Sequence, residues 1–210
     1  MAILQERSLG TIFTHQKPFI PASGTIGVSG ITANAGATHL CIALANFLCS
    51  KFYSDTAYLE MNGSHAIHAL SRNPHTDAPF VHQRITYYPD MTLAALPEVL
   101  SRHYKYYVLD FGGPNPHTAY AFERCGIRLV IGSASPWKRE QFMKSVRNSF
   151  YNMKNKEENV YLGNLMERKS DVEQIEKDCG IRIVPVPFFP NPFRITSKDF
   201  TFFEKILGGN

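Results

Sequence analysis

The residues best suited to chemistry form one short stretch near the start of the chain. Residues 30–37 read Gly-Ile-Thr-Ala-Asn-Ala-Gly-Ala, a run of small or polar residues that includes two glycines. Glycines allow backbone N–H groups to approach an anion closely, and the N-terminus of a helix adds partial positive charge. Because a helical pattern follows, residues 30–37 are expected to form a phosphate-binding loop.

Two acidic residues at the ends of apolar runs are the next candidates. Asp110 ends the run 104–110, and Glu60 ends the run 56–60. A parallel strand that ends in an acid places its carboxylate at the carboxyl edge of the sheet, where ligands bind in doubly wound folds. A structural explanation stays open for both residues: Asp110 caps the turn that follows, and Glu60 lies with Asn62 in a polar turn.

The elements that must position these residues follow from the apolar pattern. Residues 25–29 form a buried-strand run, and from residue 38 the apolar positions recur at helical spacing. Alternation of this kind predicts an α/β fold, a doubly wound and mostly parallel sheet with helices on both faces. Strands are expected near residues 25, 56, 84 (an edge strand), 106, 127, 160 and 181, and helices over 38–51, 64–71, 93–103, 116–125, 135–154, 170–179 and 197–207.

The amino-acid composition is that of an ordinary globular protein. The 210 residues suit a single domain over 24–210 with an N-terminal arm over 1–23. The net charge of +4 is too small to imply a nucleic-acid partner by itself. The four cysteines show no CxxC spacing, and neither a signal peptide nor a membrane span is evident. A reducing, cytoplasmic setting is expected.

Two segments together resemble the MinD/ParA class of P-loop ATPases. Residues 25–50 are similar to the Walker A region of that class, which reads roughly G-K-G-G-x-G-K-T-T, and residues 104–113 are similar to its Walker B strand. The fold expected is therefore P-loop NTPase-like. Two departures stand out: Ala37 occupies the Walker lysine position, and Ile31 occupies that of the second, signature lysine. The spacing from Gly30 to Gly36 is also one residue longer than in the P-loop pattern.

The resemblance implies a set of site residues. Magnesium would be held by Thr38 and Asp110, with Glu60 helping to organise it. Asn164 would contact the adenine, and Pro187 lies in the segment that packs over the base. The implied cofactors are ATP or ADP with Mg²⁺, or none. The full implied nucleotide-binding set is Gly30, Asn34, Ala35, Gly36, Ala37, Thr38, His39, Asn164 and Pro187.

The missing lysines favour a pseudo-ATPase. No arginine or lysine lies within residues 30–39 to replace them, and one preorganised charge is typically worth about 100- to 1000-fold in rate. The resemblance then implies a bacterial scaffold, localisation or regulatory factor that binds nucleotide weakly or not at all, similar to TadZ and CpaE. It would act as a homodimer or with a protein partner, in the cytoplasm or recruited by that partner to the membrane.

Two alternatives stay open. The first is an active ATPase that binds DNA or membrane through the basic helix expected over 135–154, which carries Lys144 and Arg147. The second is a structural subunit whose empty loop packs against a neighbour, for which the small residues Ala33, Ala35 and Ala37 are suited. The final helix, over 197–207, is expected to pack on the core rather than on a membrane, because it lacks a basic flank.

A pair of histidines lies outside this constellation. His65 and His68 are three residues apart, so on a helix they would lie one turn apart and share a metal. No third ligand is evident near them in the sequence. A surface pair is therefore the favoured interpretation.

Overall fold

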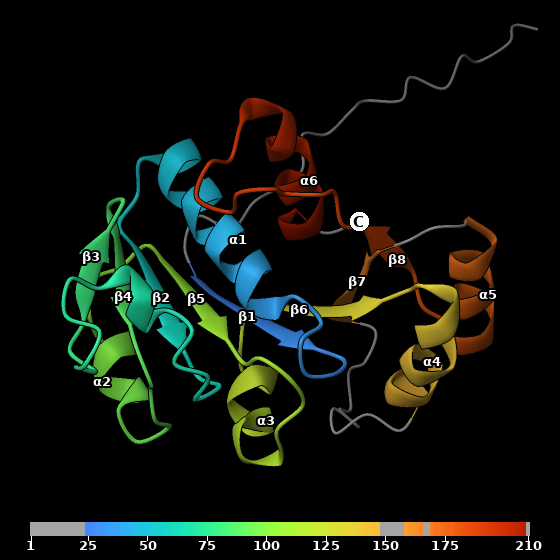
Figure 1. The fold of residues 1–210 in the computed structure, drawn as a ribbon, viewed down its shortest axis with the longest axis horizontal. Coiled ribbons are helices and arrows are strands. Elements are labelled where there is room, and N and C mark those ends of the chain that lie inside the picture. Colours follow the sequence, from blue (N-terminus) through green and yellow to red (C-terminus); the bar gives the residue numbers. More distant parts are fainter. Residues whose placement is uncertain (1–23, 148–157, 166–168, 209–210) are drawn as a thin grey trace, which may run out of the picture.

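The computed structural model of the chain describes residues 24–147, 158–165 and 169–208. Their centre is an eight-stranded sheet with the strand order β3-β4-β2-β5-β1-β6-β7-β8 (Figure 1). The strands are β1 Gly24–Gly30, β2 Thr56–Glu60, β3 Phe80–His82, β4 Ile85–Tyr88, β5 Tyr106–Asp110, β6 Ile127–Ser133, β7 Asn159–Asn164 and β8 Ile183–Pro185.

Every strand pair except β3–β4 is parallel, which confirms the predicted doubly wound sheet. β1 lies between β5 and β6, and β5 also pairs with β2. In these registers Asp110 lies opposite both Val28 of β1 and Glu60 of β2. The carboxyl ends of the three strands therefore meet at one edge, beside the loop that follows β1.

Helices cover both faces of the sheet, as predicted. α1 and α6 lie on one face, and α2, α3, α4 and α5 lie on the other (Figure 1). Short 3₁₀ helices precede β3 and α4. The bounds are α1 Ala37–Phe52, α2 Leu96–Leu100, α3 Pro116–Glu123, α4 Arg139–Arg147, α5 Lys169–Cys179, α6 Ser197–Leu207, η1 His68–Leu70 and η2 Pro136–Lys138.

The C-terminal helix α6 is a core element. Its Phe203 is fully buried and stacks on Phe47 of α1, with ring centroids 4.9 Å apart. The helix begins with a capping box, in which Thr196 and Asp199 satisfy each other's backbone and side-chain groups. The predicted packing of residues 197–207 on the core is therefore confirmed. None of the helices in the described part of the chain is both long and apolar enough to cross a membrane.

The strand predicted over 83–88 is correct in position but wrong as an edge. β4 pairs on one side with β2 and on the other with β3, which is the edge strand. Gln83 and Arg84 form the hairpin turn between β3 and β4, with φ of 47° and 67°. Two-residue hairpins need this positive φ and usually take it from Asn or Gly, so the sequence carried no signal for the turn.

Several helix predictions needed correction in extent. The helix expected over 64–71 is reduced to the 3₁₀ turn η1, because the residues before it are held in a loop described below. The helix over 93–103 shrinks to α2, in which Pro97 occupies the first turn, where a helix tolerates proline. The helix over 135–154 begins as η2 and continues as α4 to Arg147; its last predicted residues, and the predicted arm over 1–23, lie outside the described residues.

Candidate functional site

The loop between β1 and α1 has the backbone geometry of an anion site. Gly36 caps α1 with a φ of 97°, and no side chain caps the helix. The first backbone N–H groups of α1 therefore remain available to a ligand. Gly30 is needed because a Cβ there would lie 2.6 Å from the carbonyl oxygen of Thr32. Asn34 turns the loop with a φ of 60°.

The structure brings the predicted magnesium ligands Thr38 and Asp110 together. The Thr38 hydroxyl donates to Asp110 Oδ2 over 2.6 Å, although 72 residues separate them. The Tyr58 hydroxyl donates to the same oxygen over 2.7 Å, and the Gly112 amide donates to Oδ1 over 2.9 Å. A carboxylate has about four acceptor positions. Three of those of Asp110 are therefore filled within the chain.

Sequence reasoning missed Tyr58. It lies on β2 two residues before Glu60, so the two side chains share one face of the sheet. Tyr58 lies opposite Val108 of β5, and its hydroxyl reaches diagonally to Asp110, two residues further along that strand. A tyrosine at this place in a buried apolar strand was the available signal, but the pairing of β2 with β5 was needed to use it.

Burial raises the pKa of Asp110 above its ordinary value of 3.8, while hydrogen bonds from Thr38, Tyr58 and the Gly112 amide oppose the shift. A carboxyl group with a raised pKa in the folded state gives stability that is present below pH 3.8 and is lost as pH rises through the folded pKa. We therefore expect the free energy of unfolding of the wild type to fall with rising pH above 3.8, relative to Asp110→Asn. The slope is at most about 1.4 kcal/mol per pH unit.

Urea titrations at a series of pH values, in EDTA, measure this difference for the two proteins. Parallel pH profiles of wild type and Asp110→Asn would show that the carboxyl group does not titrate differently in the folded state.

Glu60 is fully buried, and its carboxylate is engaged with a loop rather than with Thr38. Oε1 accepts from the Ser64 hydroxyl over 3.0 Å and from the Ala66 amide over 2.8 Å. Oε2 accepts from the Asp90 amide over 3.3 Å. Asn62 closes the turn by accepting from the Ser64 amide. The polar-turn alternative thus describes the contacts that Glu60 makes in this structure.

The two positions where the resemblance would place lysines carry buried apolar side chains. Ala37 lies in the core on α1, and Ile31 belongs to the core on the opposite face of the sheet. Ile31 Cδ1 packs directly against Gly132, because a Cβ atom at position 132 would lie only 2.7 Å from Ile31 Cδ1. Neither residue therefore supplies the positive charge that a lysine would bring to the loop.

The remaining predicted nucleotide contacts serve the chain itself. Asn164 Nδ2 donates to the carbonyl of Ala35 over 3.4 Å, which ties the end of β7 to the loop. His39 Nε2 lies 2.8 Å from the carbonyl oxygen of Phe189, in the segment that joins β8 to α6. Pro187 is exposed in that same segment. Asn164 is therefore brought to the loop, whereas His39 contacts the segment between β8 and α6, in which Pro187 lies two residues before Phe189.

A cavity of about 320 Å³ opens beside the loop, and one of the residues that line it is a lysine, Lys138. The sequence alone did not place this lysine near the loop. Its walls include residues 31–35 of the loop together with Trp137 and Lys138 of η2. Lys138 Nζ donates to Gln141 Oε1 over 3.3 Å. Because η2 follows the carboxyl end of β6, it reaches the same sheet edge as the loop. The pairing of β1 with β6 brings Lys138 close to the loop, and the sequence of residues 30–39 alone does not reveal this pairing.

The basic helix is partly engaged within the chain. Arg139 forms an ion pair with Asp171 of α5, at 3.3 Å, and Arg147 donates to the carbonyl of Asp178 over 3.1 Å. α4 thus packs on α5 through two of its basic side chains. Of these two charges, that of Arg139 is neutralised by a carboxylate, whereas Arg147 keeps its charge because its acceptor is a backbone carbonyl.

Comparisons with known proteins establish the fold. No protein-family model matches the chain, and no curated protein resembles it significantly in sequence. Among solved structures, it is similar to a plasmid partition protein from Borrelia burgdorferi bound to AMPPNP (TM-score 0.61, 13% identity, 88% of this chain and 95% of that one). It is also similar to the septum site-determining protein MinD from Pyrococcus horikoshii with Mg-ADP (0.59, 14%, 87% and 94%), and to a ParA family ATPase from Chlorobium tepidum (0.58, 12%, 78% and 83%).

These neighbours are ParA and MinD family P-loop ATPases, so the predicted P-loop NTPase-like fold is confirmed. The residues of this chain fit the magnesium ligands and the backbone amides of a nucleotide site, but not its lysines. Thr38 and Asp110 supply the hydroxyl and carboxylate oxygens that Mg²⁺ prefers, and the uncapped start of α1 supplies amides. The lysine positions do not fit, because Ile31 and Ala37 are apolar and buried.

Proposed function

We propose that the chain is a pseudo-ATPase of the MinD/ParA type that acts as a scaffold, localisation or regulatory factor. The observation that carries the proposal is the burial of Ile31 and Ala37 in the two hydrophobic cores, at the positions of the two family lysines. Phosphoryl transfer depends on cations that stabilise charge on the transferred group. With both positions apolar, hydrolysis is expected to be negligible.

Nucleotide binding is proposed to be weak or absent. If ATP or ADP binds with Mg²⁺, Thr38 and Asp110 are the residues that hold the metal, which neutralises phosphate charge when present. The backbone amides at the start of α1 would contact the phosphates. Lys138, the one lysine or arginine among the described residues lining the cavity, would supply positive charge from the other side of the loop.

The proposed partner surface is the sheet edge at the loop. Trp137 and Leu165 are large apolar residues that line the cavity and are exposed by 71% and 66%. Ala33 lines the same cavity and is exposed, whereas Ala35 and Ala37 are buried. We infer that a second copy of the chain docks on Ala33, Trp137 and Leu165, which gives the homodimer that the fold resemblance implies. Sedimentation of the wild type against Trp137→Ala measures this association.

The alternative of an active ATPase that binds DNA or membrane is less well supported. It rests on a basic face of α4, in which the charge of Arg139 is already paired with that of Asp171. The positioning role, as in the resemblance to TadZ and CpaE, needs no such face.

The chain offers a direct assay of nucleotide binding, because Trp137 is its single tryptophan and lines the cavity. Titration with Mg-ATP, followed by Trp137 fluorescence and by calorimetry, is paired with a phosphate-release assay. We expect phosphate release no faster than that of Thr38→Ala, whatever the binding signal. Turnover well above that control would overturn the pseudo-ATPase proposal.

Ala37→Lys alone is expected to leave phosphate release at the level of the wild type. Ile31 remains apolar, and the loop keeps its extra residue between Gly30 and Gly36. Each missing preorganised charge is worth about 100- to 1000-fold in rate, so one replacement leaves a large deficit. The phosphate-release assay measures this, with Ala37→Met as the control for side-chain size. Rapid turnover by Ala37→Lys would show that the rest of the site is already organised for hydrolysis.

A further inference from the structure

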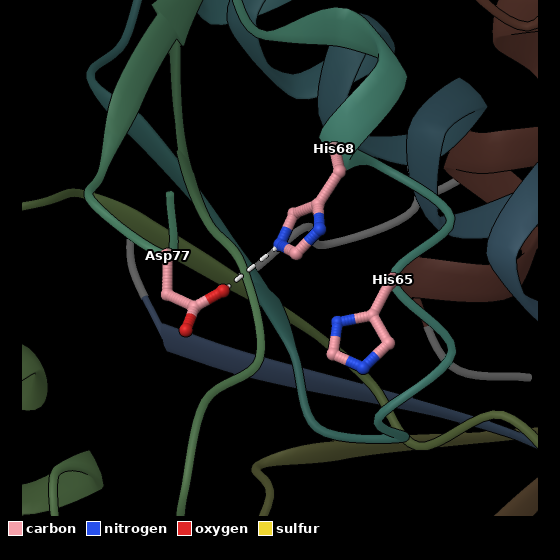
Figure 2. Close-up of side chains that lie close together, drawn as sticks. All are labelled: His65, His68 and Asp77. Carbon is pink, nitrogen blue, oxygen red and sulfur yellow. Dashed lines mark ion pairs between the residues drawn. The ribbon is translucent and has the colours of Figure 1, made fainter. Parts of the chain in front are cut away.

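Three side chains with metal-binding groups meet in the segment between β2 and β3. His65 and His68 are joined there by Asp77, from the turn that precedes β3 (Figure 2). Each offers one ligand atom, and the three atoms lie within 4.8 Å of one another. We propose that His65, His68 and Asp77 bind a divalent transition-metal ion, for which Zn²⁺ is the probe.

The geometry requires only small adjustments of the side chains. Zn²⁺ binds imidazole nitrogen and carboxylate oxygen at about 2.0–2.2 Å, which sets tetrahedral ligand atoms about 3.3 Å apart. His68 Nε2 and Asp77 Oδ1 are already 3.2 Å apart, and the two imidazole centroids are 5.0 Å apart. His65 and Asp77 are exposed, so their side chains can rotate toward the centre without disturbing the core.

The contact between His68 and Asp77 is compatible with a bound cation. The buried Nε2 atom of His68 has one polar neighbour among the described residues, Asp77 Oδ1 at 3.2 Å, in an ion-pair contact that lacks the geometry of a hydrogen bond (Figure 2). Either a proton on Nε2 or a metal ion would make this contact between the ring nitrogen and the carboxylate oxygen favourable. A metal ion between them satisfies both groups, and His65 supplies a second nitrogen to the same point.

The segment that carries the histidines is held in place independently of any metal. Glu60 binds Ser64 and Ala66, the residues on either side of His65, and His65 itself has a φ of 54°. Ile67, which precedes His68, is buried in the core. Two ligands are thus preorganised, and the metal would join them to Asp77 across the turn that leads to β3.

The donor set defines the chemistry of the ion. Two imidazoles and one carboxylate suit Zn²⁺ and related transition metals, whereas Mg²⁺ prefers oxygen ligands alone. Three protein ligands also leave a fourth position for water or a partner's group. None of the three ligands belongs to the loop over 30–37 or to the proposed magnesium ligands Thr38 and Asp110.

The test is a titration of tag-free protein with Zn²⁺ in competition with a chromophoric chelator, in excess Mg²⁺. We expect one high-affinity site per chain, and visible absorption bands when Co²⁺ replaces Zn²⁺. His65→Gln, His68→Gln and Asp77→Asn should each weaken Zn²⁺ binding by no less than the roughly 10- to 100-fold that loss of an outer-shell partner costs, and should remove the Co²⁺ bands. His117→Gln, which changes an exposed histidine on α3, should change neither.

Two results would overturn the proposal. One is a wild type that binds Zn²⁺ no more tightly than Asp77→Asn, which would show that Asp77 is not a metal ligand. The other is binding reduced equally by His117→Gln and by the three cluster variants, which would show nonspecific binding to surface histidines. Asp77 is exposed by 67%, so Asp77→Asn remains interpretable if a histidine variant fails to fold.

Discussion

Glu60→Ala is expected to lower the free energy of unfolding by about 3 kcal/mol. The substitution leaves the Ser64 hydroxyl and the amides of Ala66 and Asp90 without their acceptor, at a fully buried position. Hydrogen bonds to a charged group are worth about 1.5–3 kcal/mol each, and water can replace part of that in the loop. Urea unfolding in EDTA, without nucleotide, measures the loss.

Two further variants define the cause of that loss. Glu60→Gln keeps one oxygen for Ser64 and Ala66 and should cost less, about 1–2 kcal/mol. Glu123→Ala, at an exposed position on α3, should change stability by no more than about 0.5 kcal/mol. If Glu60→Ala costs no more than Glu123→Ala, Glu60 does not anchor the loop, and its predicted role at a nucleotide-bound magnesium regains support. An anchoring role also predicts weaker Zn²⁺ binding by Glu60→Ala, because His65 lies between the two anchored residues.

Phe203→Ala should have a larger effect, about 3–5 kcal/mol, which is typical of removing a fully buried phenylalanine. Phe203 stacks on Phe47 and on Phe189, with ring centroids 4.9 Å and 5.4 Å apart. Its removal leaves a cavity between α1 and α6 that also borders the segment held by His39. Chemical denaturation followed by circular dichroism measures the change.

The matched control is Phe188→Ala, because Phe188 is the neighbour of Phe189 and is exposed by 86%. Its expected effect is within about 0.5 kcal/mol. A small effect of Phe203→Ala, comparable to that of Phe188→Ala, would contradict the docking of α6 on α1 and would reopen a surface or membrane role for this helix.

The sequence by itself determined the fold class and the place of the site. The strand, the small-residue loop and the helix over 25–51 are adjacent along the chain, so their signals are local and could be interpreted without tertiary contacts. The same holds for the apolar strand that ends in Asp110, and for α6 with its one-sided aromatic residues. These local patterns are present in the sequence even though Ile31 and Ala37 replace the lysines that the resemblance implies.

The tertiary structure decided what the candidate residues contact. Tyr58 reaches Asp110 only because β2 pairs with β5, and Lys138 reaches the loop only because β6 lies beside β1. Glu60 serves its own loop because its carboxylate is captured by Ser64 and Ala66. Asp77 completes the histidine cluster from twelve residues along the chain after His65. Such contacts depend on strand order and side-chain direction, which neither composition nor periodicity encodes.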